Sequence, residues 1–123
     1  MTTDRIETGQ SAEIDAEVTA DLTINRTGKE GDEVLSTPSL LMLMEQCCIK
    51  ASDLHLPDTH TTVGYAVDGM RHLAPTPIGH KVRVKSVLTE VDGNRLTYSL
   101  EAFEGDKIIG VAIHKRAVIA KQA

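Results

Sequence analysis

The sequence contains very few aromatic residues: its 123 residues include two tyrosines, one phenylalanine and no tryptophan. Proteins that bind nucleic-acid bases or sugars stack them on exposed aromatic rings, so this composition disfavours both kinds of ligand. The net charge of -5 at pH 7 has the wrong sign for general binding to nucleic acids or anionic membranes. We therefore expect no nucleic-acid partner and no membrane partner, whereas a small anionic ligand could still bind at a local basic patch.

The sequence also shows no membrane-spanning or secretory pattern. No stretch approaches the roughly 18 consecutive apolar residues of a membrane span, and residues 1–10 lack the basic flank and apolar run of a secretory signal. The two cysteines, Cys47 and Cys48, are adjacent, whereas a zinc site needs about four ligands at workable spacing. We expect a cytoplasmic protein with no metal site, in which both cysteines are small buried side chains.

Length and hydrophobic content predict a single domain. With 123 residues, 41% of them hydrophobic, the chain is long enough to bury roughly two-thirds of its unfolded surface without help from a disulfide or a metal. We expect residues 1–123 to form one domain, with residues 1–12 as a flexible N-terminal segment.

Hydrophobic alternation predicts a long strand at residues 13–24, where apolar and polar side chains alternate strictly. Residues 25–32 carry Gly28 and Gly31 among charged side chains, which predicts a loop that could act as a flap. A helix should follow, with Thr37 as its N-cap and a proline at its first position. Its apolar run is typical of a helix wrapped by other structure, which in so small a domain must be a curved sheet.

The second half of the sequence predicts four further strands separated by turns. The predicted strands are residues 61–70, 81–91, 95–103 and 107–119, with hairpin turns at residues 92–94 and 104–106. One strand, one helix and four mostly antiparallel strands belong to the α+β class. This is the element inventory of the hotdog fold, in which a curved five-stranded sheet surrounds a long central helix.

Three polar residues are candidates for chemistry. Glu45 is a carboxylate in an otherwise apolar helix. If it is buried, it needs a charged or hydrogen-bonding partner, a raised pKa or a cavity beside it; alternatively, it faces solvent. His72, at the end of the second strand, is the strongest of five histidines, although a lone histidine is most often structural. For Thr37, capping of the helix is the competing explanation. Thr37 and Glu45 lie about 12 Å apart along a helix, so their contact needs a folded-back loop or a two-fold axis.

Together these residues resemble the fluoroacetyl-CoA thioesterase type of hotdog thioesterase. The matching segments are Val34-Leu35-Ser36-Thr37-Pro38 up to Glu45, Thr62-Val63-Gly64, residues 72–79 (HLAPTPIG) and residues 114–119 (HKRAVI). The resemblance covers most of the chain, from about Val34 to Ile119. Its most specific parts are the threonine-to-glutamate spacing and the string that begins at His72.

The resemblance implies a homodimer that hydrolyses an acyl-CoA thioester, with Thr37, Glu45 and His72 at the positions of the family's catalytic residues. It also implies that Gly64 lies beside the thioester carbonyl, where a backbone N–H would stabilise the oxyanion. A carboxylate can attack a thioester directly or deprotonate water, and both roles stay open for Glu45. His72 is expected to act as acid or base, and Thr37 to orient the carboxylate. No cofactor is implied, because coenzyme A is part of the substrate.

Further substrate contacts are expected from glycines and from basic residues. Gly69, like the glycine at position 64, is a place where the backbone could approach a ligand closely. Arg71, Lys81 and Arg116 are candidates for contacts with the CoA phosphates.

The chain departs from the family's pattern in two places. One extra residue separates Gly64 from His72, and a bulge at Asp68-Gly69 is expected to absorb it. Glycines also occupy the flap where the fluoroacetyl-CoA enzyme has bulky aromatic residues. We therefore expect a small or medium acyl group rather than selectivity for fluoroacetyl.

Two other functions fit the same residues. A hotdog acyl-CoA hydratase or dehydratase also uses an acid–base pair, although it needs no third group at Thr37. A non-catalytic dimeric acyl-CoA-binding module would keep the pocket without turnover, and the extra residue near Gly69 favours it. Whether a dimer pairs further into a dimer of dimers stays open.

Overall fold

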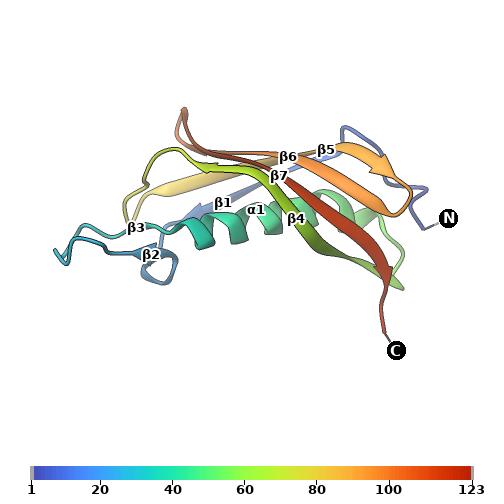
Figure 1. The fold of residues 1–123 in the computed structure, drawn as a ribbon, viewed down its shortest axis with the longest axis horizontal. Coiled ribbons are helices and arrows are strands. Elements are labelled where there is room, and N and C mark those ends of the chain that lie inside the picture. The colour runs from blue at the N-terminus through green and yellow to red at the C-terminus, as the bar shows by residue number, and fades with distance from the viewer. Residues whose placement is uncertain (1, 123) are drawn as a thin grey trace.

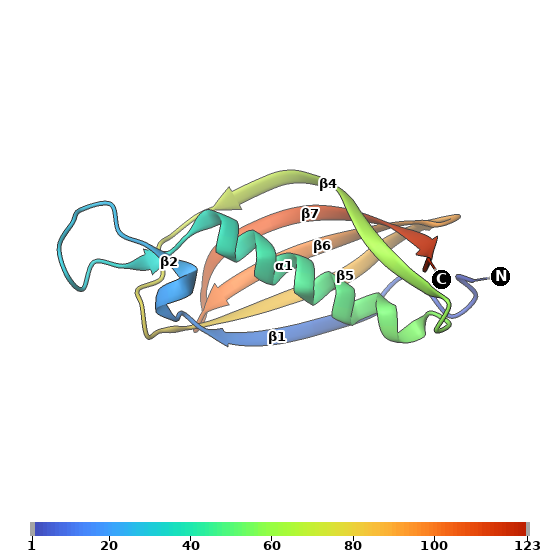
Figure 2. The same ribbon diagram turned by 90° about the horizontal axis from the view of Figure 1, so that it is seen from below.

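The computed structural model describes residues 2–122 as a curved antiparallel sheet with one long helix along its concave side (Figure 1, Figure 2). The sheet has the order β1 (Ser11–Glu17), β5 (Lys81–Asp92), β6 (Arg95–Glu104), β7 (Lys107–Ala120) and β4 (His60–His72), and the helix is α1 (Thr37–Ser52). Shorter elements are η1 (Ala20–Leu22), β2 (Thr23–Ile24), β3 (Val34–Leu35) and η2 (Asp53–His55). The α+β class and the order of one helix within five strands confirm the prediction.

The start of α1 differs from the prediction by one residue. Ser36, not Thr37, is the N-cap: its Oγ accepts a hydrogen bond from the backbone N–H of Ser39 at 3.2 Å. Pro38 lies in the first turn, where the missing N–H leaves no helical bond unmade. The predicted capping role of Thr37 is therefore wrong, because the preceding serine already caps the helix, and the Thr37 hydroxyl is available to another partner.

The sheet covers one face of α1 and leaves the other exposed. The face toward the sheet is buried and consists of Leu40, Leu43, Met44, Cys47, Cys48, Ala51 and Ser52. The prediction that both cysteines are buried is confirmed. Helix and sheet approach closely at Gly110 of β7, where a Cβ would lie 2.8 Å from Leu40 Cδ2. On the opposite face Pro38, Met42 and Glu45 are exposed in the single chain.

Two predicted boundaries near the N-terminus are wrong. Ser11 and Ala12, expected in a flexible segment, pair with β5 as part of β1. The predicted strand at residues 13–24 ends at Glu17 and is followed by a turn, η1, before the short strand β2. The Thr23 hydroxyl donates to the Ala20 carbonyl oxygen at 2.7 Å. Such local side-chain bonds compete with strand pairing even where the polar–apolar alternation continues.

Strand β4 contains two irregularities, and it is an edge strand because within residues 2–122 it pairs only with β7. Its register shifts between Gly64 and Ala66 and again between Asp68 and Arg71. Gly69, in the second shift, has a φ of 58°, a conformation that favours glycine. The predicted bulge at Asp68-Gly69 is thus confirmed.

The predicted loop and hairpin turns are also confirmed. Gly93 joins β5 to β6 and Gly105 joins β6 to β7, and both have positive φ values, 61° and 59°. The loop between β2 and β3 extends away from the sheet and helix (Figure 2). No helix among the described residues is long and apolar enough to cross a membrane.

Candidate active site

Thr37 and His72 form a hydrogen-bonded pair. Thr37 lies in the first turn of α1 and His72 at the end of β4, and 2.9 Å separates Thr37 Oγ1 from His72 Nδ1. The pair lines a cleft of about 300 Å³ whose other walls are mostly aliphatic, including Ile24, Val34 and Leu73. Two of the three predicted catalytic residues therefore meet beside an apolar cleft.

The imidazole of His72 is partly buried, which affects its protonation state. Burial lowers its pKa below the ordinary value, so the neutral form predominates at pH 7. Its Nε2 is buried and has no hydrogen-bond partner in the part of the chain that the structure describes. A buried nitrogen without a hydrogen-bond partner costs free energy. Contact with a ligand or a partner subunit would supply that partner.

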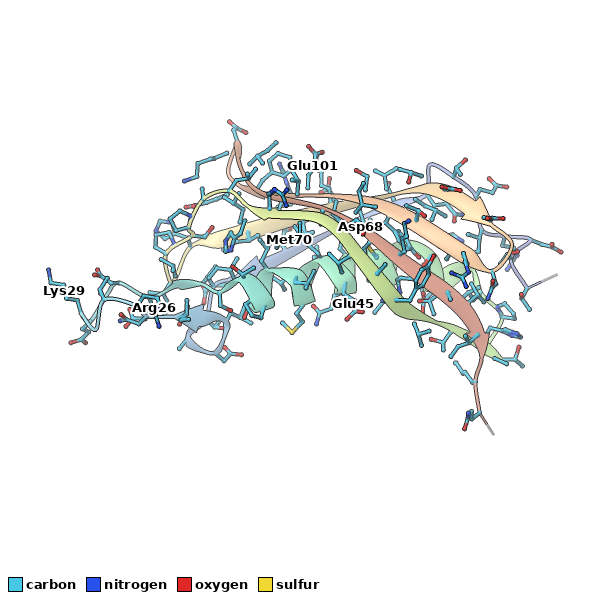
Figure 3. The ribbon with its side chains drawn as sticks, viewed as in Figure 1. Arg26, Lys29, Glu45, Asp68, Met70 and Glu101 are labelled. Carbon is cyan, nitrogen blue, oxygen red and sulfur yellow. The ribbon has the colours of Figure 1, made fainter. Side chains whose placement is uncertain are left out.

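Glu45 lies two turns further along α1 and has a different set of partners. Its Oε2 accepts a hydrogen bond from Arg116 Nη1 at 2.9 Å, while its side chain is 47% exposed. It opens onto two clefts, of about 270 and 350 Å³, that share His114 and Val67. Figure 3 shows Glu45 at the lower edge of α1, away from the body of the sheet. Both alternatives predicted for Glu45 therefore apply, because the carboxylate has an ion-pair partner and also faces solvent.

Arg116 is an internal residue, which corrects its predicted role as a contact for the CoA phosphates. It occupies an inward position of β7 and is only 3% exposed. Its Nε donates to the Thr62 hydroxyl and its Nη2 to the Thr62 carbonyl oxygen, both at 2.9 Å. The Thr62 hydroxyl in turn donates to Asp53 Oδ1 at 2.7 Å. Thr62 thus binds two nitrogens of the guanidinium, and the third, Nη1, binds Glu45.

His114 belongs to the same cluster, although the sequence favoured His72 among the five histidines. Its Nε2 lies 3.1 Å from Arg116 Nη1 and 3.8 Å from Glu45 Oε2. Burial lowers the pKa of His114, and the charge of Arg116 lowers it further. The signal that could have identified it is its place in β7: polar residues at alternate, core-facing positions of a strand require buried partners.

Gly64 of β4 packs directly against these groups. A Cβ at this position would lie 2.9 Å from Glu45 Oε2 and 2.9 Å from His114 Cε1. In the β4–β7 ladder Gly64 is opposite Arg116. Only glycine therefore lets the strand backbone approach the carboxylate this closely.

We expect Gly64→Ala to lower activity strongly because the added methyl group displaces the Glu45 carboxylate. Turnover should fall on the order of 100-fold, as when a reacting group moves by about 1 Å. Steady-state kinetics of the purified variant measures this, with Val63→Ala on the exposed neighbouring position as control. Unchanged turnover in Gly64→Ala would show that the close approach has no catalytic consequence.

The remaining predicted contacts lie outside both clusters. A Cβ on Gly69 would meet nothing within 4 Å, and its positive φ belongs to the bulge; close approach of its backbone to a ligand stays a prediction. Arg71 is exposed and donates from Nη1 to the Met70 carbonyl oxygen at 2.9 Å. Lys81 is exposed at the start of β5, opposite Glu17. The roles of Arg71 and Lys81 in CoA binding stay predictions.

Residues 2–122 contain no group of three or more histidine, cysteine or acidic side chains that could hold a metal ion.

Comparison with known proteins identifies the family. The family model described as fluoroacetyl-CoA-specific thioesterase matches residues 18–122. The chain belongs to this family. The fluoroacetyl-CoA thioesterase of Streptantibioticus cattleyicolor is 37% identical over 90 residues, which are 73% of this chain and 64% of that enzyme. The match thus spans slightly less than two-thirds of that relative's length.

Solved structures agree with this membership of the fluoroacetyl-CoA-specific thioesterase family. A solved structure of the fluoroacetyl-CoA thioesterase FlK has a TM-score of 0.83 and 31% identity, covering 95% of this chain and 90% of that one. A thioesterase superfamily member from Thermus thermophilus has a TM-score of 0.84 at 26% identity, covering 96% and 87%. A hot-dog-like protein from Thermanaerovibrio acidaminovorans, at 24% identity and a TM-score of 0.85, covers 97% and 87%. The predicted resemblance and the hotdog fold are confirmed.

Proposed function

We propose that the protein is an acyl-CoA thioesterase that hydrolyses a small or medium acyl-CoA to the free acid and CoA. The observation that carries this proposal is the half-exposed Glu45 carboxylate, fixed by Arg116 and packed against Gly64. Membership of the fluoroacetyl-CoA-specific thioesterase family supports it. Crystal structures of FlK variants contain fluoroacetate with CoA in one case and acetyl-CoA in another.

Two routes use the same carboxylate. In the first, a Glu45 oxygen bonds to the thioester carbonyl carbon, the C–S bond breaks and CoA leaves as the thiol after taking a proton; water then hydrolyses the anhydride. In the second, Glu45 takes a proton from water, the water oxygen bonds to the carbonyl carbon, the C–S bond breaks and CoA leaves as the thiol after taking a proton. His72 supplies or accepts the proton, Thr37 orients the Glu45 carboxylate, and a backbone N–H near Gly64 stabilises the oxyanion. Oxygen-18 from labelled water enters the Glu45 carboxylate only by the first route.

The walls of the clefts support an aliphatic acyl group without selectivity for fluoroacetyl. Gly28 and Gly31 lie in the loop between β2 and β3 with open space where a Cβ would be. Figure 3 shows Lys29 at the far end of this loop, so the segment carries charge where an aromatic lid would be needed. Aliphatic side chains such as Ile24 and Leu73 remain to contact the substrate beside Thr37 and His72.

A homodimer is the proposed assembly, because it covers two features that the single chain leaves open. One is the unpaired edge of β4, since strand edges are templates for pairing with another chain. The other is the outward face of α1, where Pro38, Leu41, Met42 and Glu45 line one cleft. A two-fold axis between Leu41 and Met42 would bring Pro38 opposite Glu45 of the partner subunit. Thr37 would then lie next to that carboxylate.

Such a dimer would unite the two clusters. Within residues 2–122 no hydrogen bond joins Glu45 to Thr37 or His72, and the rise of α1 separates the two ends by about 12 Å. We propose that each active site combines Glu45 of one subunit with Thr37 and His72 of the other.

The proposed compartment is the cytoplasm, where free thiols such as Cys47 and Cys48 stay reduced.

Thiol release from a panel of acyl-CoA esters tests the proposed function. Acetyl-, butyryl-, hexanoyl- and fluoroacetyl-CoA are offered at equal concentration, together with crotonyl-CoA. We expect release from the aliphatic esters and less than about tenfold preference for fluoroacetyl, since one small substituent changes discrimination by little in an aliphatic pocket. Hydration of crotonyl-CoA without thiol release would support the hydratase alternative. Tight binding of acyl-CoA without any turnover would support a binding module.

A further inference from the structure

The cluster behind Glu45 contains a histidine that the proposed mechanism does not use. We propose that His114 is a positioning residue: in its neutral form it accepts a hydrogen bond from Arg116 and thereby fixes the guanidinium that holds the Glu45 carboxylate. The catalytic consequence of this inference rests on the proposed thioesterase function. The hydrogen-bonding arrangement itself does not.

The contacts of His114 determine which ring nitrogen carries its proton. Nδ1 lies 2.8 Å from the carbonyl oxygen of Ala66, which can only accept, so Nδ1 bears the hydrogen. Nε2 lies 3.1 Å from Arg116 Nη1, which can only donate, so Nε2 presents its lone pair. Both neighbours therefore require the same neutral tautomer. The residue is 4% exposed, so most of the ring is held by these protein contacts although His114 borders both clefts beside Glu45.

The hydrogen bonds of Arg116 show why this acceptor matters. Nε and Nη2 both bind Thr62, so Nη1 is the nitrogen left for the carboxylate. Nη1 carries two hydrogens and has two acceptors within reach, Glu45 Oε2 at 2.9 Å and His114 Nε2 at 3.1 Å. Without an acceptor at the histidine, a buried N–H of a charged group would lose its partner, and the guanidinium would shift to regain one.

Protonation of His114 would reverse the arrangement. The groups that face the ring are Arg116 on its own strand, Glu45 on α1, Tyr98 on β6 and the Ala66 carbonyl on β4. A proton on Nε2 would meet a guanidinium nitrogen, while the carboxylate oxygen Glu45 Oε2, which can accept it, lies 3.8 Å away. Charged His114 would therefore draw the carboxylate away from Arg116. Burial lowers the pKa of this histidine below its ordinary value. The neutral form therefore persists to a lower pH than it does for a solvent-exposed histidine.

A matched pair of variants tests the proposal. In His114→Gln the amide oxygen reaches the place of Nε2 and can accept from Arg116. In His114→Asn the amide nitrogen keeps the bond to Ala66 but leaves Arg116 without an acceptor. We expect His114→Gln to stay within about threefold of the wild-type kcat and His114→Asn to lose on the order of tenfold, with KM little changed in both. Equal losses that follow the fall in Tm of the two variants would instead mean a merely structural role and overturn the proposal.

Nitrogen-15 NMR of the histidine side chains supplies a readout independent of turnover. Wild-type protein at pH 7 should show His114 protonated on Nδ1, and Glu45→Gln should lower the pKa of His114 because the neighbouring negative charge is lost. Protonation on Nε2 at pH 7 would overturn the proposal. Wild-type protein that hydrolyses no thioester but has the Nδ1 tautomer would refute the proposed function and leave the hydrogen-bonding role of His114 supported.

Discussion

Replacing Glu45 with glutamine is expected to lower kcat for thiol release by roughly 10²- to 10⁴-fold, the usual contribution of a base or nucleophile. The amide has nearly the shape of the carboxylate and can still accept from Arg116 Nη1, which lies 2.9 Å away. It can neither attack a carbonyl carbon nor take a proton from water. Because the Glu45 side chain is 47% exposed, the exchange should leave the fold intact. Thiol release at saturating substrate and a thermal unfolding curve measure both effects.

Glu101 provides the matched control for this experiment. It is an exposed carboxylate on β6 and does not line either of the clefts beside Glu45. Glu101→Gln should therefore keep wild-type kcat and Tm. If Glu45→Gln retained turnover within about threefold of Glu101→Gln, neither role of the carboxylate could stand.

Arg116→Met is expected to cost about 2–3 kcal/mol of unfolding free energy and to reduce turnover as well. Methionine has a similar length, but both bonds to Thr62 and the bond to Glu45 disappear. The larger part of the loss comes from the buried Thr62 groups, because the half-exposed Glu45 is partly solvated by water. Urea unfolding of the purified variant measures the change.

The neighbouring residue serves as control for the arginine variant. Lys115 faces the other side of β7 and contacts Asp68 across 3.7 Å, where water screens the pair. Lys115→Met should change stability by less than about 1 kcal/mol. Equal stability of Arg116→Met and Lys115→Met would contradict the account of Arg116 as an internal anchor.

Local patterns were sufficient to predict most of the fold. Strand-rich segments separated by turns predicted β5, β6 and β7, and the glycines at the hairpins predicted their turns. Errors arose where two local signals compete. Ser36 and Thr37 are both good capping residues, and only the observed bond to Ser39 decides between them. Past Glu17 the alternation continues, but threonine and aspartate side chains favour a turn.

The candidate site could be predicted only in part, because its partners are distant in sequence. Glu45 was recognisable as a lone carboxylate in an apolar helix. Its partner Arg116 lies 71 residues away and is brought to it by the register of β7 against β4. That register also sets Gly64 beside both, which no local pattern reveals. The basic character of Arg116 suggested a surface phosphate contact, whereas its inward position on β7 makes it internal.

Subunit complementation tests the central claim, that hydrolysis requires Glu45 of one subunit and His72 of the other. Glu45→Gln and His72→Ala chains with different tags are refolded together, and the mixed dimer is confirmed by mass. Half of the dimers formed at random are mixed, and each restores one intact site of two, so about a quarter of wild-type thiol release should return. Mixed dimers with no more activity than the separate variants would contradict the claim, because a site built within one chain stays broken in both subunits.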